Sequence, residues 1–144
     1  MKSELVEVVI REVVPTPGGF AVFLGNHEKT FVIYVDHDVG AAILMFYKSI
    51  AKPRPLTHDL IGSILTGLEA RVHKVVINDL KANTFYARLI LSEESSGRKR
   101  IVEIDARPSD CVAVALQQDV PILVARGVLE KVKDVSEMLG GEEP

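Results

Sequence analysis

Hydrophobic positions in the first third of the chain occur in short runs that are rich in Val and Ile and bounded by turn residues. Such runs are typical of β-strands. Gly and Pro residues between them indicate loops, and residues 25–28 indicate a hairpin. The pattern predicts a three-stranded antiparallel unit with strands at residues 5–10, 20–24 and 30–35.

The same order of strands and then helices recurs after residue 70. Further strands are predicted at residues 72–80, 84–91 and 101–106, with a turn at 81–83 and a polar flexible loop at 93–99. Helical spacing predicts helices at 39–50, capped by Asp36 or Asp38, at 57–68, and from 108 onward. A short buried strand at 121–124 and an amphipathic helix at 128–139 complete the chain.

This arrangement favours an α+β fold in which two antiparallel three-stranded units are each followed by helices. We expect one domain over residues 1–139 and a frayed tail at 140–144. The helix at 39–50 is apolar on all sides, and such a helix must be buried on all sides. A small domain can seldom cover it alone, so we expect a homo-oligomer, most simply a dimer.

The helix at residue 57 has a distinctive start. Pro53 and Pro55 keep the backbone extended, so the helix cannot begin before Thr57. Thr57 is predicted as the N-cap, and a carboxylate at Asp59 suits the positive end of the helix dipole. Arg54 and His58 accompany them.

A shorter version of this motif occurs at residues 105–110, where Arg107 and Pro108 precede Ser109 and Asp110. An apolar helix again follows. The repetition indicates either an internal duplication or two helix N-termini aimed at one cleft.

Three segments carry a family resemblance: residues 54–60 (Arg-Pro-Leu-Thr-His-Asp-Leu), 83–87 (Asn-Thr-Phe-Tyr-Ala) and 105–110 (Asp-Ala-Arg-Pro-Ser-Asp). In this order and at these separations, they resemble the bifunctional nuclease family from about Phe31 to Val124. The resemblance implies a compact α/β domain, found in bacteria and plants, with nuclease activity on both RNA and DNA. Where the family tends to show Gly-x-x-Glu, this chain has Asp36-His37-Asp38-Val39, so any role of that Glu would pass to Asp36 or Asp38.

Composition and net charge restrict the classes of function that this chain can have. The chain has 144 residues, 47% of them hydrophobic, which suffices for a core. A net charge of −3 argues against binding nucleic acid through bulk electrostatics, so such contacts must be local. One cysteine suits a reducing cytoplasm, and the longest apolar run is too short to cross a bilayer. We expect a soluble cytoplasmic protein.

Phosphodiester hydrolysis needs cations for the phosphoryl oxygens and commonly a divalent metal that activates water. Arg54 and Arg107 are candidates to clamp phosphate, and His58 is a candidate general base or acid. The predicted catalytic residues are Arg54, His58, Asp59, Arg107 and Asp110, and the predicted ligands of Mg²⁺ or Mn²⁺ are Asp59, Glu103, Asp105 and Asp110.

A structural interpretation of these residues competes with the catalytic one. Arg54 with Asp59, and Arg107 with Asp110, can be ion pairs that fasten a loop to its helix, while Thr57 and Ser109 act as caps. Cys111 fits a small core residue. Two hypotheses therefore stand: a nuclease of low sequence specificity acting on DNA and RNA, and a non-catalytic oligomeric domain that binds a small anionic ligand or a protein partner.

Overall fold

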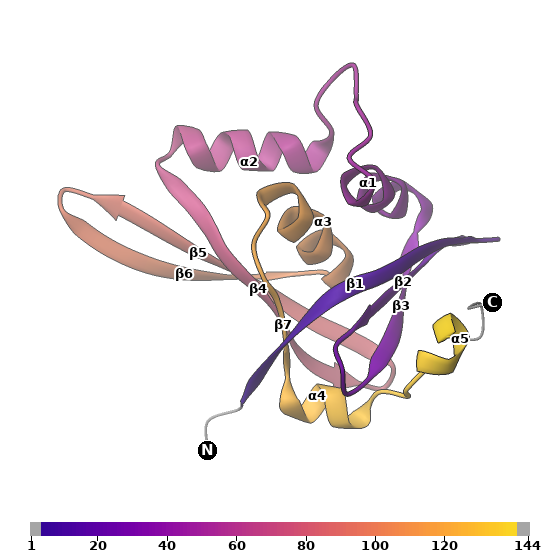
Figure 1. Ribbon diagram of the computed structural model, residues 1–144. Helices are drawn as coiled ribbons and strands as arrows, with labels where there is room; N and C mark the ends of the chain where they lie inside the picture. The colour runs from indigo at the N-terminus through magenta and orange to yellow at the C-terminus, as the bar shows by residue number, and fades with distance from the viewer. Residues whose placement is uncertain (1–3, 141–144) are drawn as a thin grey trace.

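The computed structural model describes residues 4–140 and has the predicted α+β architecture (Figure 1). Both three-stranded antiparallel units are confirmed, as are the helices that follow them. The elements in chain order are β1 (Leu5–Thr16), β2 (Gly19–Gly25), β3 (Thr30–Asp36), α1 (His37–Tyr47), α2 (Thr57–Gly67), β4 (Ala70–Lys81), β5 (Thr84–Ser95), β6 (Arg98–Ala106), α3 (Pro108–Gln118), β7 (Ile122–Ala125), α4 (Arg126–Lys131) and α5 (Ser136–Gly140).

The two strand units form one seven-stranded mixed sheet in the order β3-β2-β1-β7-β4-β5-β6. The short strand β7 joins them, because it pairs antiparallel with β1 and parallel with β4. The sheet is strongly twisted, so that β1–β3 cross the direction of β4–β6, and the β5–β6 hairpin projects at one side (Figure 1).

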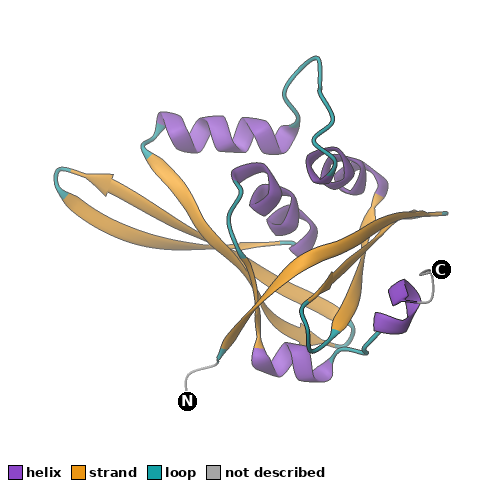
Figure 2. Ribbon diagram, in the orientation of Figure 1, coloured by secondary structure: helices purple, strands orange, loops and turns teal. Residues whose placement is uncertain are grey.

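Helices α1, α2 and α3 lie together on one side of this sheet (Figure 2). The central helix of the three is α3, whose residues from Cys111 to Ala115 are all buried. Helix α1 approaches β2 closely, since a Cβ added at Gly40 would collide with the ring of Phe20. The predicted core role of Cys111 is confirmed.

The apolar helix α1 needs less cover than its sequence indicates. Residues 39–47 are all buried or half-buried within one chain, because α1 packs against β2 on one side and α3 on another. Larger exposed fractions of apolar side chains occur on several other elements, for example at Leu60 of α2 (55%) and Ile101 of β6 (54%). Helix α1 therefore supplies no argument for an oligomer, and the oligomer remains a prediction.

The predicted loop at 93–99 and the predicted helix at 128–139 both differ from the structure. The polar segment at 93–99 is not a flexible loop, because β5 and β6 continue to a tight turn at Ser96 and Gly97, whose φ values are 54° and 76°. Positive φ at both central residues is the geometry that joins twisted antiparallel strands.

The terminal helix predicted at 128–139 is also broken, into α4 and α5. The backbone N–H of Val135 donates to the carbonyl of Thr30 (2.7 Å), and the Thr30 N–H donates to the Asp134 carboxylate (3.1 Å). Bonding to the start of β3 keeps the segment between the helices extended. Within the predicted frayed tail, Gly140 ends α5 and residues 141–144 lie outside the described residues.

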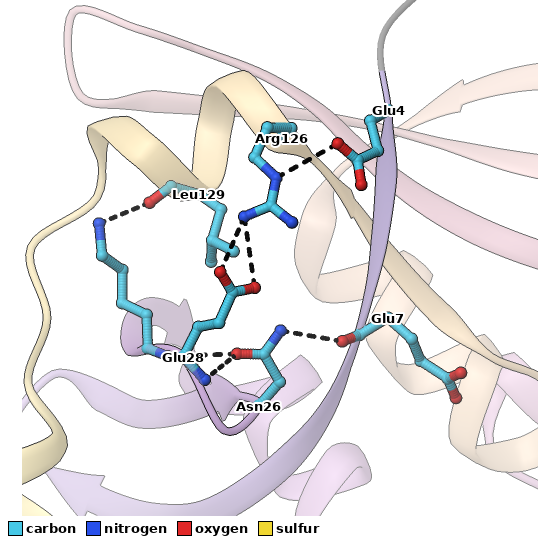
Figure 3. Close-up of polar contacts among 7 residues, drawn as sticks. Glu4, Glu7, Asn26, Glu28, Arg126 and Leu129 are labelled. Carbon is cyan, nitrogen blue, oxygen red and sulfur yellow. Dashed lines mark hydrogen bonds and ion pairs between the residues drawn. The ribbon is translucent and has the colours of Figure 1, made fainter.

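A polar cluster fastens the β2–β3 hairpin to α4 and to the start of β1 (Figure 3). Arg126 lies between Glu28 (Nη1 to Oε2, 3.1 Å) and Glu4 (Nε to Oε1, 3.6 Å). Asn26 turns the hairpin by accepting the Glu28 N–H (2.8 Å), and Lys29 Nζ donates to the carbonyl of Leu129 (2.7 Å). In the described range, no helix is long and apolar enough to cross a membrane.

Candidate functional site

Three helix N-termini surround one cavity of about 500 Å³ on the helix-bearing side of the sheet. The start of α1 contributes Asp38, the start of α2 contributes His58, and the start of α3 contributes Arg107 and Asp110. Thr57 and a set of apolar residues form the rest of the wall: Val39, Ala42, Leu56, Ile61, Leu89, Ala106 and Val114. The N-termini of α2 and α3 thus face one cavity, as one of the two interpretations of the repeated motif predicted. The positive ends of helix dipoles favour a bound anion in such a cavity.

His58 is the buried polar residue of this cavity, with 6% of its surface exposed. It lies in the first turn of α2, and its Nε2 is 3.0 Å from Oδ1 of Asp110 in α3. Its Nδ1 is enclosed and has no hydrogen-bond partner among residues 4–140. A neutral ring whose Nε2–H donates to Asp110 would carry a free lone pair on Nδ1, the state required of a base.

Asp110 is shared between His58 and Arg107. The Arg107 guanidinium donates from Nε to Oδ2 (2.8 Å) and from Nη2 to Oδ1 (3.2 Å), and Asp36 lies 3.7 Å from its Nη1. Burial raises the pKa of Asp110, but the hydrogen bonds from Arg107 and His58 outweigh it and leave this pKa below its ordinary value. The same hydrogen bond with Asp110 raises the pKa of Arg107.

The predicted helix cap at Thr57 is wrong by one residue. Leu56 is the N-cap, with extended backbone (φ −81°, ψ 170°), and Thr57 is the first helical residue. Asp59 satisfies the helix start instead, because its carboxylate accepts the backbone N–H of Leu56 (2.8 Å). Lys52, rather than Arg54, forms the ion pair with Asp59 (3.4 Å).

The five predicted catalytic residues divide between two places. His58, Arg107 and Asp110 meet in the cavity described above. Arg54 and Asp59 line a different, shallower cavity of about 360 Å³ beside Gln117 of α3. Within one chain, Arg54 and Arg107 are therefore not brought into a common cleft.

The four predicted metal ligands are likewise dispersed. Glu103 accepts a hydrogen bond from Arg88 (2.9 Å) on the opposite face of the sheet, and Asp105 is exposed on that same face of β6. Asp59 caps α2, and Asp110 bonds Arg107. In the described part of the chain, no three His, Cys, Asp or Glu side chains are placed to hold a metal ion, so the four predicted ligands do not form one metal site made of protein ligands alone.

A neighbouring cavity of about 410 Å³ brings in residues that site prediction did not include. Asn83 of the β4–β5 turn and Thr84 and Phe85 at the start of β5 line it together with Arg107 and Ser109. Arg107 thus lines both cavities. The signal for Asn83 and Thr84 was present in the sequence, as part of the second resemblance segment.

Comparison with known proteins gives the same family that these segments suggest. The sequence profile of the bifunctional nuclease domain matches residues 22–137, which is most of the chain. The chain belongs to the bifunctional nuclease domain family. Two uncharacterized proteins of Mycobacterium tuberculosis, from strains CDC 1551 and H37Rv, are each 39% identical to it over 104 residues.

The matched region is 72% of this chain and 59% of each Mycobacterium relative, so the chain spans less than two thirds of the curated relatives it matches. The resemblance of residues 36–39 to a Gly-x-x-Glu segment implies an acidic residue where this chain has Val39. Val39 lines the His58 cavity, and Asp38 beside it lines the same cavity. A carboxylate at this end of the cavity therefore comes from Asp38 in this chain.

Proposed function

We propose that this domain is a nuclease of low sequence specificity that hydrolyses phosphodiester bonds in DNA and RNA at the cavity formed by His58, Arg107 and Asp110. The observation that carries the proposal is the position of Arg107. Its side chain lines both cavities, and segments from all three resemblance motifs form their walls. Family membership and local geometry therefore support the same place.

Each residue has a chemical role in this proposal. The planar Arg107 guanidinium, 59% exposed, binds two phosphate oxygens when it turns from Asp110 toward the substrate. Asp110 orients His58 through Nε2, and Nδ1 takes a proton from the attacking water. The water oxygen bonds to phosphorus, the phosphorus–oxygen ester bond breaks, and solvent protonates the leaving oxygen. Because Nδ1 is enclosed, the segment from Leu56 to His58 must shift when substrate enters.

We also propose that Mg²⁺ or Mn²⁺ assists the reaction, although the four predicted metal ligands do not lie close together. Mg²⁺ is commonly held by one or two carboxylates together with substrate phosphates. Cytoplasmic action also belongs to the proposal, since the single cysteine, Cys111, is buried and needs no oxidising compartment. The net charge of −3 limits nucleic-acid contacts to this local site.

One observation favours the second hypothesis, a non-catalytic domain that binds a small anion or a protein partner. Arg107 already has Asp110 and Asp36 as partners, and His58 Nδ1 is closed off. An arrangement of this kind suits the fastening of α2 to α3. In that case the cavity would bind anions without cleaving them.

The decisive experiment mixes purified protein with fluorescent single-stranded DNA or RNA in Mg²⁺ or Mn²⁺, with and without chelator. The nuclease proposal predicts cleavage that chelator stops and that His58→Gln reduces by at least about tenfold in protein that stays folded. Inorganic phosphate binding with no cleavage in any metal would support the second hypothesis. Cleavage that is unchanged in His58→Gln would indicate a contaminating nuclease and reject the site.

A further inference from the structure

The two edges of the sheet differ in how they are protected. At one edge, Asp134 and Val135 bond to Thr30 at the start of β3. At the other edge, β6 pairs with β5 in an unbroken register from Ala106 to Arg98, with no bulge and no proline. Within the described residues, no strand lies beyond β6. An uncovered edge of this length is a template for another strand.

The charges along β6 are arranged so that the strand complements itself. Residues 98–100 are Arg-Lys-Arg, and the acidic residues Glu103 and Asp105 follow at the other end. Two copies paired in antiparallel would bring each basic end against an acidic end, whereas parallel pairing would align like charges. In the register centred on Val102, Lys99 of each copy lies opposite Asp105 of the other copy. The interface therefore contains two such pairs. Neither residue makes an ion pair in residues 4–140.

Two apolar side chains of β6 itself are exposed. Ile101 is 54% exposed and Ile104 is 41% exposed, and strand alternation places them on opposite faces of the sheet. A second strand paired at this edge would cover part of both side chains.

We propose that a second copy of this chain binds at β6, with the two β6 strands paired antiparallel across a two-fold axis near Val102. A two-fold axis closes the contact, so the assembly stops at a dimer. This assignment rests on a different element from α1, which one chain already covers. It does not depend on the proposed nuclease activity.

The proposed dimer has a consequence for the Arg107 cavity, which directly follows β6 in the chain. An axis perpendicular to the sheet keeps both cavities on the same side. At about 3.3 Å per residue, the five residues from Val102 to Arg107 separate the two Arg107 positions by roughly 30 Å. One extended polyanion could then contact both sites.

The test is the mass of the protein in solution by light scattering at micromolar concentration. We expect the mass of two chains for the natural sequence and of one chain for Val102→Lys, which places two like charges beside the axis. Tyr34→Lys is the matched control, because Tyr34 is 72% exposed on β3, the other edge strand, and should keep the dimer. Circular dichroism and a thermal melt establish that each variant is folded.

Charge exchange gives a second measurement that does not depend on Val102. Lys99→Glu alone and Asp105→Lys alone should each raise the dimer dissociation constant at least about tenfold, and the double exchange should restore it. If the natural protein has the mass of one chain, or if folded Val102→Lys and both single exchanges remain as dimeric as Tyr34→Lys, the proposed β6 interface is wrong.

Discussion

His58 Nε2 lies 3.0 Å from Oδ1 of Asp110, although 52 residues separate the two in the sequence. This contact joins the first turn of α2 to the first turn of α3 and closes one wall of the cavity. Because Asp110 also holds Arg107, one carboxylate fixes both the candidate base and the candidate phosphate ligand. Substitutions of Asp110 and of its neighbours can separate its structural role from its chemical role.

Asp110→Asn should lower the free energy of unfolding at pH 7 by about 1–3 kcal/mol, because it removes the charge that Arg107 and His58 bind. Urea denaturation measures the change. Asp119→Asn is the control, since Asp119 has a left-handed backbone (φ 58°) that Asn also accepts. Equal stability of the two variants would mean that the His58–Asp110–Arg107 contacts contribute nothing to the fold.

The same carboxylate should contribute to acid unfolding. The pKa of Asp110 is below its ordinary value of 3.8 in the folded state, so the unfolded state binds more protons as the pH falls. Its contribution is complete above about pH 5 and is lost as the pH falls through the lowered pKa. Stability measured from pH 6 to pH 2 should therefore fall less steeply in Asp110→Asn than in the natural sequence. Parallel curves would contradict the lowered pKa.

Asp59→Ala should cost about 0.5–2 kcal/mol of stability, because Asp59 accepts the Leu56 N–H at the start of α2. Asp59 lines the Arg54 cavity rather than the Arg107 cavity, so cleavage per folded molecule should stay close to that of the natural sequence. Thermal melts and cleavage rates measured on the same preparation test both statements. A tenfold loss of cleavage in fully folded Asp59→Ala would instead show that Asp59 takes part in catalysis.

Cys111 should be unreactive in the folded protein. Burial raises the pKa of its thiol to about 12, and its side chain is enclosed in α3. A chromogenic disulfide reagent at pH 8 should modify Cys111 only as fast as the protein unfolds, and immediately in urea. Rapid modification without denaturant would show that α3 opens locally.

The fold was predictable from the sequence because its signals are local. Val- and Ile-rich runs, turn residues and helical spacing locate both strand units and the helices. The errors arose where distant contacts decide the backbone. Residues 133–135 look compatible with a helix, but bonding to Thr30 keeps them extended. Likewise, α1 looks as if it needs a partner until α3 and β2 are seen to cover it.

The site was predictable only in part, for the same reason. Arg54, His58 and Asp59 are neighbours in sequence, yet a helix turns adjacent side chains about 100° apart. His58 therefore points toward α3 and Asp110, while Asp59 turns back to its own helix start. The separation of Glu103 and Asp105 from Asp110 follows from strand alternation, which puts these two on the far face of the sheet.

Arg107 is the central residue of the proposed site, and comparison of the two arginines in the Arg-Pro motifs tests its role directly. The measurement is the single-turnover cleavage rate of labelled single-stranded RNA with Mn²⁺ by folded Arg107→Lys and Arg54→Lys. A lysine keeps the charge but loses the bidentate geometry. We expect at least about a tenfold loss for Arg107→Lys and little change for Arg54→Lys, because Arg54 lies in the other cavity. Equal rates for the two variants, or a loss confined to Arg54→Lys, would contradict the assignment of Arg107 as the phosphate ligand.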